Sequence, residues 1–150
     1  MIEIEDLRLI GYRHRANTST GRREVLNSCS IAVIGATGVV GQVFLDILEQ
    51  RNFPASQIRL CASHRSSGQR VKVFGEELVV EETTMDSFRG ADISFISASS
   101  EISRKFAPLA ARQGSIVIDD SSAFRMQPEV PLVVPEINAR DLEGHQGVIS

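Results

Sequence analysis

The chain has 150 residues, of which 42% are hydrophobic and 23% charged, with a net charge of −3. These values are ordinary for one globular domain, and the slight acidity gives no reason to expect nucleic acid as a partner. No apolar run reaches the roughly 20 residues that cross a bilayer, and the two cysteines, Cys29 and Cys61, are too few for a disulfide framework. We therefore expect a soluble, cytoplasmic protein that binds neither nucleic acid nor membrane, and we predict no metal site.

The start of the chain differs in composition from the rest. Residues 13–23 are polar and basic with little hydrophobic periodicity, which is typical of a mobile extension. An organelle transit peptide is the alternative, but such peptides are poor in acidic residues, and the chain begins with Glu3, Glu5 and Asp6 among its first residues. We expect a polar, mobile N-terminal extension at residues 1–28 and one domain at residues 29–150.

Strand-like and helix-like patterns alternate from Ser30 onward. Continuous apolar runs are typical of parallel strands buried on both faces, and apolar residues at helical spacing predict helices that pack one face on a sheet. In chain order the patterns predict a strand at 31–34, a helix at 39–51, a strand at 58–62, a hairpin at 71–80, a strand at 93–96, a helix at 102–113 that Pro108 should kink or leave with a free carbonyl, and a strand at 115–119. This alternation indicates an α/β fold, Rossmann-like and doubly wound, with a mostly parallel sheet and flanking helices.

The turn after the first predicted strand carries three glycines, Gly35, Gly38 and Gly41, at a G-x-x-G-x-x-G spacing. Glycines allow a sharp reversal and let backbone N–H groups approach a pyrophosphate, while the helix that follows presents unpaired donors to the same anion. The order of strand, glycine turn and helix favours a dinucleotide-binding turn. A purely structural turn is the alternative, because glycine triplets also occur in ordinary turns.

No carboxylate stands at the end of the second predicted strand, where NAD-binding folds carry an acidic residue for the adenosine ribose. The sequence there reads Ala62-Ser63-His64-Arg65-Ser66. Arginine with neighbouring hydroxyls binds a 2′-phosphate through charge-assisted hydrogen bonds, whereas a carboxylate would repel it. The sequence therefore favours NADP over NAD. The alternative is an exposed loop whose arginine is merely solvated.

The ends of two later strands supply further candidates. Ser97 and Ala98 are small residues beyond the strand that follows the hairpin, where ligands lie in open α/β sheets. Arg125 follows the last predicted strand and is the candidate anion clamp; the alternative is a surface arginine that caps the carboxylates of Asp119 and Asp120. Those two carboxylates alternate in direction, so we expect capping or turn roles for them rather than acid–base roles.

Four segments together resemble aspartate-semialdehyde dehydrogenase. They are the glycine turn at 35–41, the segment at 62–66, Ser121-Ser122-Ala123-Phe124-Arg125-Met126, and Val130-Pro131-Leu132-Val133-Val134-Pro135-Glu136-Ile137-Asn138. The resemblance spans residues 29–150, and the last segment is more discriminating than the turn, which related acyl-phosphate reductases share. The resemblance implies NADP contacts at Gly35, Thr37, Gly38, Val39, Val40, Gly41, Ser63, Arg65, Ser66, Ser97 and Ala98, and a phosphate contact at Arg125. Ser99 and Ser100 stand where many relatives have glycines.

The same resemblance implies an activity: NADP-dependent reduction of aspartyl phosphate to aspartate semialdehyde, with release of phosphate, in lysine, threonine and methionine biosynthesis. It also implies a homodimer for the full-length enzyme. The family uses a cysteine nucleophile in an Asn-Cys motif shortly after a strand that resembles residues 147–150, and a second domain carries the general base. We expect this chain to lack both and to be inactive alone.

The cysteines and histidines of the chain do not replace that nucleophile. Cys29 precedes the first strand and Cys61 ends the second, so we expect buried or neutral thiols. The three histidines are expected on the surface, and of these His64 could touch the adenosine phosphate. Two alternatives stay open: a stand-alone NADP-binding or regulatory module, and a related acyl-phosphate reductase such as N-acetyl-gamma-glutamyl-phosphate reductase.

Overall fold

The computed structural model describes residues 29–150, and the extension predicted at residues 1–28 lies outside the described residues. Within this part of the chain the strands are β1 (Cys29–Ile34), β2 (Ala55–Ala62), β3 (Arg70–Val73), β4 (Glu76–Val79), β5 (Glu81–Glu82), β6 (Ile93–Ile96), β7 (Ile116–Asp119) and β8 (Val148–Ile149). The helices are α2 (Val39–Gln50), α3 (Ser100–Arg112) and α4 (Pro135–Asn138), with short 3-10 turns η1 (His64–Ser66), η2 (Met85–Phe88) and η3 (Ala139–Gly144). None of the described helices is long and apolar enough to cross a membrane.

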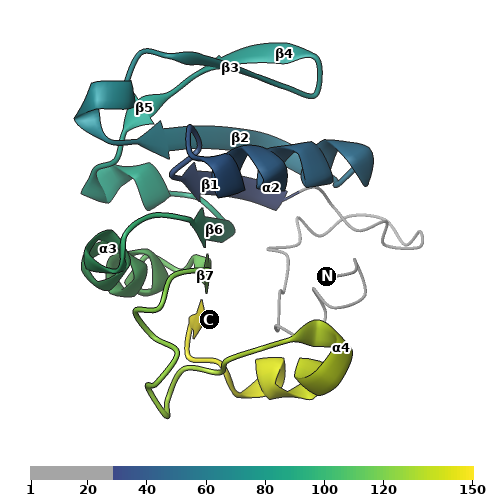
Figure 1. Cartoon of the computed structure of the whole chain (residues 1–150), viewed down its shortest axis with the longest axis vertical. Helices are drawn as coiled ribbons and strands as arrows, with labels where there is room; N and C mark the ends of the chain where they lie inside the picture. Colours follow the sequence, from purple (N-terminus) through teal and green to yellow (C-terminus); the bar gives the residue numbers. More distant parts are fainter. Residues whose placement is uncertain (1–28) are drawn as a thin grey trace, which may run out of the picture.

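Six of the strands form one parallel sheet in the order β5-β2-β1-β6-β7-β8. β1 lies in the middle, and the chain extends the sheet first to one side of it and then to the other. Figure 1 shows the hairpin β3–β4 beyond one end of this sheet and α4 beyond the other. This is the strand order of doubly wound dinucleotide-binding folds, and it leaves a crevice where the direction of winding reverses, between β1 and β6. The predicted α/β fold is confirmed.

The two faces of the sheet belong to different cores, because successive side chains of a strand point to opposite faces. On β1, Ile31 packs in the core that includes Leu45 of α2. Its neighbour Ala32 belongs to the core that includes Phe106 of α3. Helices therefore cover both faces, and the central strand is buried on each, which explains its continuous apolar run.

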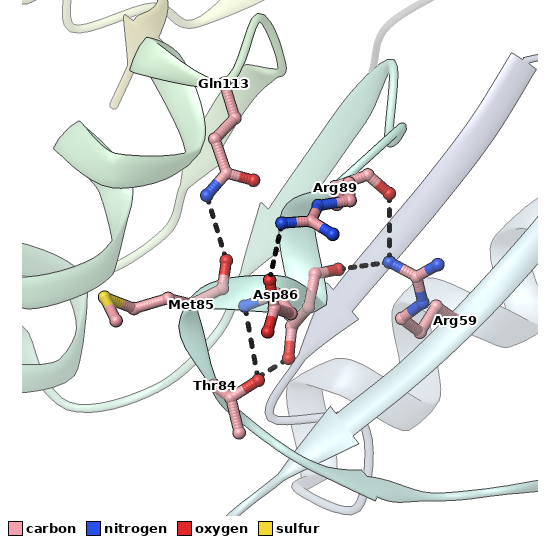
Figure 2. A network of polar contacts seen from close by, with 7 residues as sticks. Arg59, Thr84, Met85, Asp86, Arg89 and Gln113 are labelled. Carbon is pink, nitrogen blue, oxygen red and sulfur yellow. Dashed lines mark hydrogen bonds and ion pairs between the residues drawn. The ribbon is translucent and has the colours of Figure 1, made fainter.

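Turn η2, which connects β5 to β6, is held from two directions (Figure 2). On one side, the Arg59 guanidinium of β2 donates to the carbonyl oxygens of Ser87 at 2.7 Å and Arg89 at 3.3 Å. On the other, Gln113 at the end of α3 donates through Nε2 to the carbonyl oxygen of Met85 at 2.9 Å. These bonds fix the start of β6 relative to both β2 and α3.

The structure departs from the predicted elements in a few places. β2 begins at Ala55, before the predicted start at residue 58, and β5 was not predicted. Helix α3 runs through Pro108 to Arg112. The hairpin is confirmed, and its turn consists of Phe74 and Gly75 with φ values of +49° and +80°. Positive φ at both central residues matches the twist of a two-residue hairpin.

Candidate functional site

The glycine turn lies so close to neighbouring backbone that two of its glycines have no room for a side chain. Gly35 has φ +84°, and a Cβ built there would lie 1.9 Å from the Ser97 carbonyl oxygen at the end of β6. A Cβ on Gly41, in the first turn of α2, would lie 2.3 Å from the Gly35 carbonyl oxygen. The first glycine thus lets the ends of β1 and β6 approach, and the last lets α2 pack against the turn.

Backbone donors gather at the start of α2. Gly38 is the N-cap residue and has no side chain that could cap the helix, while its own N–H donates to the Gly35 carbonyl oxygen at 2.9 Å. The next amides, of Val39, Val40 and Gly41, belong to the first helical turn, where no intrahelical acceptor exists. The Val39 side chain is 84% exposed. An uncapped helix start beside the crevice is suited to an anion.

A cleft of about 580 Å³ opens beside this turn, over the ends of β2, β1 and β6. Its lining includes eight of the residues predicted to contact the cofactor, namely Gly35, Thr37, Gly38, Ser63, Arg65, Ser66, Ser97 and Ala98. The other predicted positions, Val39, Val40, Gly41 and Arg125, are not among the residues that line it. The structure therefore brings the three predicted segments after β1, β2 and β6 together around one cavity.

Several lining residues were not predicted as site residues. Lys105 and Phe106 come from α3, and the Lys105 ammonium lies 4.9 Å from the centroid of the Phe106 ring. Glu82 and Thr83 come from β5 and the residue after it. The sequence predicted α3 from its helical spacing alone. That spacing places Lys105 near Phe106 and Ile102 on the helix, but it does not reveal that these residues line the cleft.

The charges of the cleft are mixed. Arg65 and Lys105 contribute two cationic side chains, and Glu82 contributes a carboxylate. His64 Nδ1 lies 3.0 Å from Glu82 Oε2. An ionised carboxylate can only accept hydrogen bonds, so the imidazole is the donor in this contact. The segment after β2 has no carboxylate of its own, but β5 brings one beside it.

Ser99 and Ser100 adopt ordinary backbone conformations, and neither has a positive φ. Ser99 is the N-cap of α3, and its Oγ accepts from the Ile102 N–H at 3.4 Å. Ser100 Oγ lies 3.0 Å from Ser122 Oγ, which joins the start of α3 to the loop after β7. At these positions the serines take capping and loop-anchoring roles that glycine could not supply.

The carboxylates after β7 separate as their alternation predicts. Asp119 is buried, and its two oxygens accept hydrogen bonds from Ser103 Oγ at 2.6 Å and Ser121 Oγ at 2.8 Å. Asp120 lies on the exposed side. Partial desolvation raises the pKa of the Asp120 carboxyl, and the neighbouring Asp119 charge raises it further, while Ser97 and Arg125 lower it. Asp119 thus anchors the loop to α3, a structural role.

Arg125 is exposed, and its guanidinium folds back onto its own loop. Nε donates to the Ser121 carbonyl oxygen at 3.0 Å, and Nη2 donates to the Asp120 carbonyl oxygen at 2.9 Å. The hydrogen-bond acceptors of Arg125 are therefore backbone carbonyls and not the two carboxylates, although its charge acts on the Asp120 carboxyl. These bonds hold the guanidinium in place, and within residues 29–150 Nη1 has no hydrogen-bond acceptor.

Neither cysteine has the properties of a nucleophile. Both are buried free thiols. Burial raises the pKa of Cys29 to about 11, with the Asp92 charge adding to the effect. Burial also raises the pKa of Cys61, although a hydrogen bond involving Ser87 opposes it. A reactive cysteine needs a stabilised thiolate, and these environments favour the neutral thiol.

Comparison with known proteins identifies similar chains. A family model described as "Semialdehyde dehydrogenase, NAD binding domain" matches residues 30–145. Aspartate-semialdehyde dehydrogenase of Bacillus subtilis is 48% identical over 120 residues, which cover 80% of this chain and 35% of that protein. The chain therefore spans about a third of the length of the curated relatives that it matches.

Solved structures agree with this similarity. Aspartate semialdehyde dehydrogenase II of Vibrio cholerae, complexed with ASA, aligns with a TM-score of 0.77 and 37% identity, over 82% of this chain and 41% of that one. The enzyme of Candida albicans with NADP aligns with a TM-score of 0.61 and 25% identity, over 71% of this chain and 33% of that one.

Proposed function

Because the chain belongs to the family of semialdehyde dehydrogenase NAD-binding domains, we propose that it is the cofactor-binding part of an aspartate-semialdehyde dehydrogenase. We further propose that this domain begins at residue 29 and that its cofactor is NADP. The family makes it an NAD(P)-binding domain. The observation that carries the proposal is the cleft itself, in which a glycine turn without room for side chains meets an arginine at the end of β2.

The residues around the cleft fit a dinucleotide. The amides of Thr37, Val39, Val40 and Gly41 would bind the pyrophosphate at the start of α2, since this helix end has free donors and no capping side chain. Ser97 and Ala98, at the end of β6, would lie beside the nicotinamide part. When bound, the cofactor supplies or accepts the hydride that a dehydrogenase transfers.

The preference for NADP over NAD rests on the charges at the β2 end of the cleft. Arg65 would pair with the 2′-phosphate through its forked donors, and Ser63 and Ser66 would add hydrogen bonds from the same segment. Lys105 of α3 brings a second cation to the lining of the cleft. The Candida albicans relative is described with NADP, which supports the same choice here.

Arg65→Ala tests this assignment. We expect the variant to bind NADP roughly 10- to 100-fold more weakly, since a hydrogen-bonded charge contributes about 1.5–3 kcal/mol, and to bind NAD almost as the wild type does. Isothermal titration calorimetry with each cofactor measures both affinities. Arg70→Ala is the matched control, because Arg70 is an exposed arginine of the hairpin that pairs with Glu77 outside the cleft. Equal losses for NADP and NAD would overturn the 2′-phosphate role.

The activity of the whole enzyme is proposed on the same basis: reduction of aspartyl phosphate to aspartate semialdehyde, with Arg125 binding the phosphate group. Arg125 is held by two carbonyls of its own loop, and a guanidinium fixed in this way is ready to bind an anion through its remaining donor atoms. The homodimer is proposed for the full-length enzyme, and sedimentation of that enzyme tests it.

A further inference from the structure

Glu82 occupies a fixed place at the β2 end of the cleft. β5 pairs in parallel with the last residues of β2, and Glu82 lies opposite Ala62 in the register. The next residue, Thr83, donates to the Ala62 carbonyl oxygen through both its N–H at 2.9 Å and its Oγ1 at 3.0 Å. The Glu82 backbone therefore cannot move away from the segment that begins at Ser63, which carries Arg65.

A carboxylate at the end of the second strand has a known effect on dinucleotides, and Glu82 lies opposite Ala62, the last residue of that strand. Beside an NAD ribose it accepts hydrogen bonds from the hydroxyls, and beside a 2′-phosphate it repels the added charge. Arg65 has the opposite preference, since it attracts the phosphate and gains little from a hydroxyl. The same end of the cleft therefore holds one group that favours each cofactor.

His64 contacts the carboxylate that would oppose NADP. Its Nδ1–H donates to Glu82 Oε2 at 3.0 Å, between a residue of η1 and a residue of β5. Both side chains also line the cleft. The bond occupies one carboxylate oxygen and restricts the rotation of a side chain that is otherwise half exposed. An anchored Glu82 has fewer orientations in which it faces the ribose.

We propose that Glu82 is a specificity-determining residue for the cofactor, and that His64 is its positioning residue, which restrains the carboxylate and occupies one of its oxygens. This inference rests on the proposed NADP role of the cleft. With His64 present, Arg65 dominates and NADP is preferred. Without it, both Glu82 oxygens and the rotation of the side chain are free, so that the carboxylate repels a 2′-phosphate more strongly and accepts from ribose hydroxyls more readily; NADP binding weakens and NAD binding improves.

A double-mutant cycle with cofactor titrations at fixed pH and salt tests the proposal. Glu82→Gln should raise the ratio of NADP to NAD affinity about three- to tenfold, because a nearby like charge is removed. His64→Ala should lower the ratio about two- to fivefold, as befits an exposed contact. In the double variant the His64 effect should vanish and the ratio should match that of Glu82→Gln, since His64 acts only through Glu82.

The controls separate this inference from the proposed function. Glu77→Gln removes an exposed carboxylate that pairs with Arg70 in the hairpin and should leave the ratio unchanged. A wild-type chain that binds neither cofactor would refute the proposed function itself. If the wild type binds NADP but Glu82→Gln leaves the ratio unchanged, the inference is wrong. It is also wrong if His64→Ala weakens NADP binding equally with Glu82 or Gln at position 82, because His64 would then bind the phosphate directly.

Discussion

Replacing Gly35 with alanine should destabilise the domain by about 2–5 kcal/mol. The residue has φ +84°, a conformation that costs an L-residue about 1–2 kcal/mol. The added Cβ would also lie 1.9 Å from the Ser97 carbonyl oxygen and 2.8 Å from its carbon. These are backbone atoms, so β6 and its loop must shift, at a cost comparable to overpacking a core, about 1–3 kcal/mol. With a typical urea dependence of about 2 kcal/mol per molar, the unfolding midpoint falls by roughly 1–2.5 M.

Two other glycines separate the contributions. Gly75→Ala has the same backbone cost, since its φ is +80°, but nothing lies within 4 Å of its Cβ. Gly38 has φ −77° and a Cβ position 3.2 Å from the Gly35 carbonyl oxygen, so Gly38→Ala should cost less than about 1 kcal/mol. Far-UV circular dichroism follows the unfolding, because the chain contains no Trp. If the Gly35→Ala and Gly75→Ala variants have the same urea midpoint of unfolding, the clash argument is refuted.

Three further predictions concern other parts of the domain. Asp119→Ala should lower the free energy of unfolding by about 2–4 kcal/mol in urea, since two buried hydroxyls lose a charged acceptor; a change below about 1 kcal/mol would contradict this. Because the pKa of Cys29 rises from 9.0 to about 11 on folding, the wild type should lose stability between pH 9 and pH 11 relative to Cys29→Ala, and parallel pH profiles would disprove it. In the full-length enzyme, Arg125→Ala should raise the KM for phosphate more than that for NADP, with Arg125→Lys restoring only part of the loss; unchanged phosphate dependence would return Arg125 to a structural role.

Much of the fold could be predicted because its signals are local. The apolar run at 31–34 indicates a strand buried on two faces, and the helical spacing after Val39 indicates a helix buried on one face. Both elements form where the pattern places them. The glycine turn could be predicted for the same reason, since strand, glycines and helix follow one another directly. Residues 63–66 and 97–98 could be predicted to lie beside one cleft because the ends of parallel strands share one edge of the sheet.

The remaining residues of the site depend on contacts that are distant in the chain. β5 consists of two exposed glutamates, which look like a loop until Ala62 is placed beside them. Lys105 faces the cleft only because Phe106 and Ala110 of the same helix are buried against the sheet, which fixes how α3 is rotated. For Arg125 the sequence indicated the loop after β7, but the carbonyl oxygens that hold its guanidinium are backbone atoms, and no side-chain pattern reveals them.

The central place of β1 also governs how the domain assembles. Ile31 pairs with Ile58 on one side and with Ile93 on the other, so neither neighbour can join until a long stretch of chain has been gathered in. Such non-local pairing makes folding slow compared with helical domains of similar size. The walls of the cleft come from segments on both sides of β1, so the cleft exists only once the sheet is complete. A molecule bound there stabilises the native state of the whole domain by mass action, in proportion to the logarithm of its concentration, rather than one corner of it.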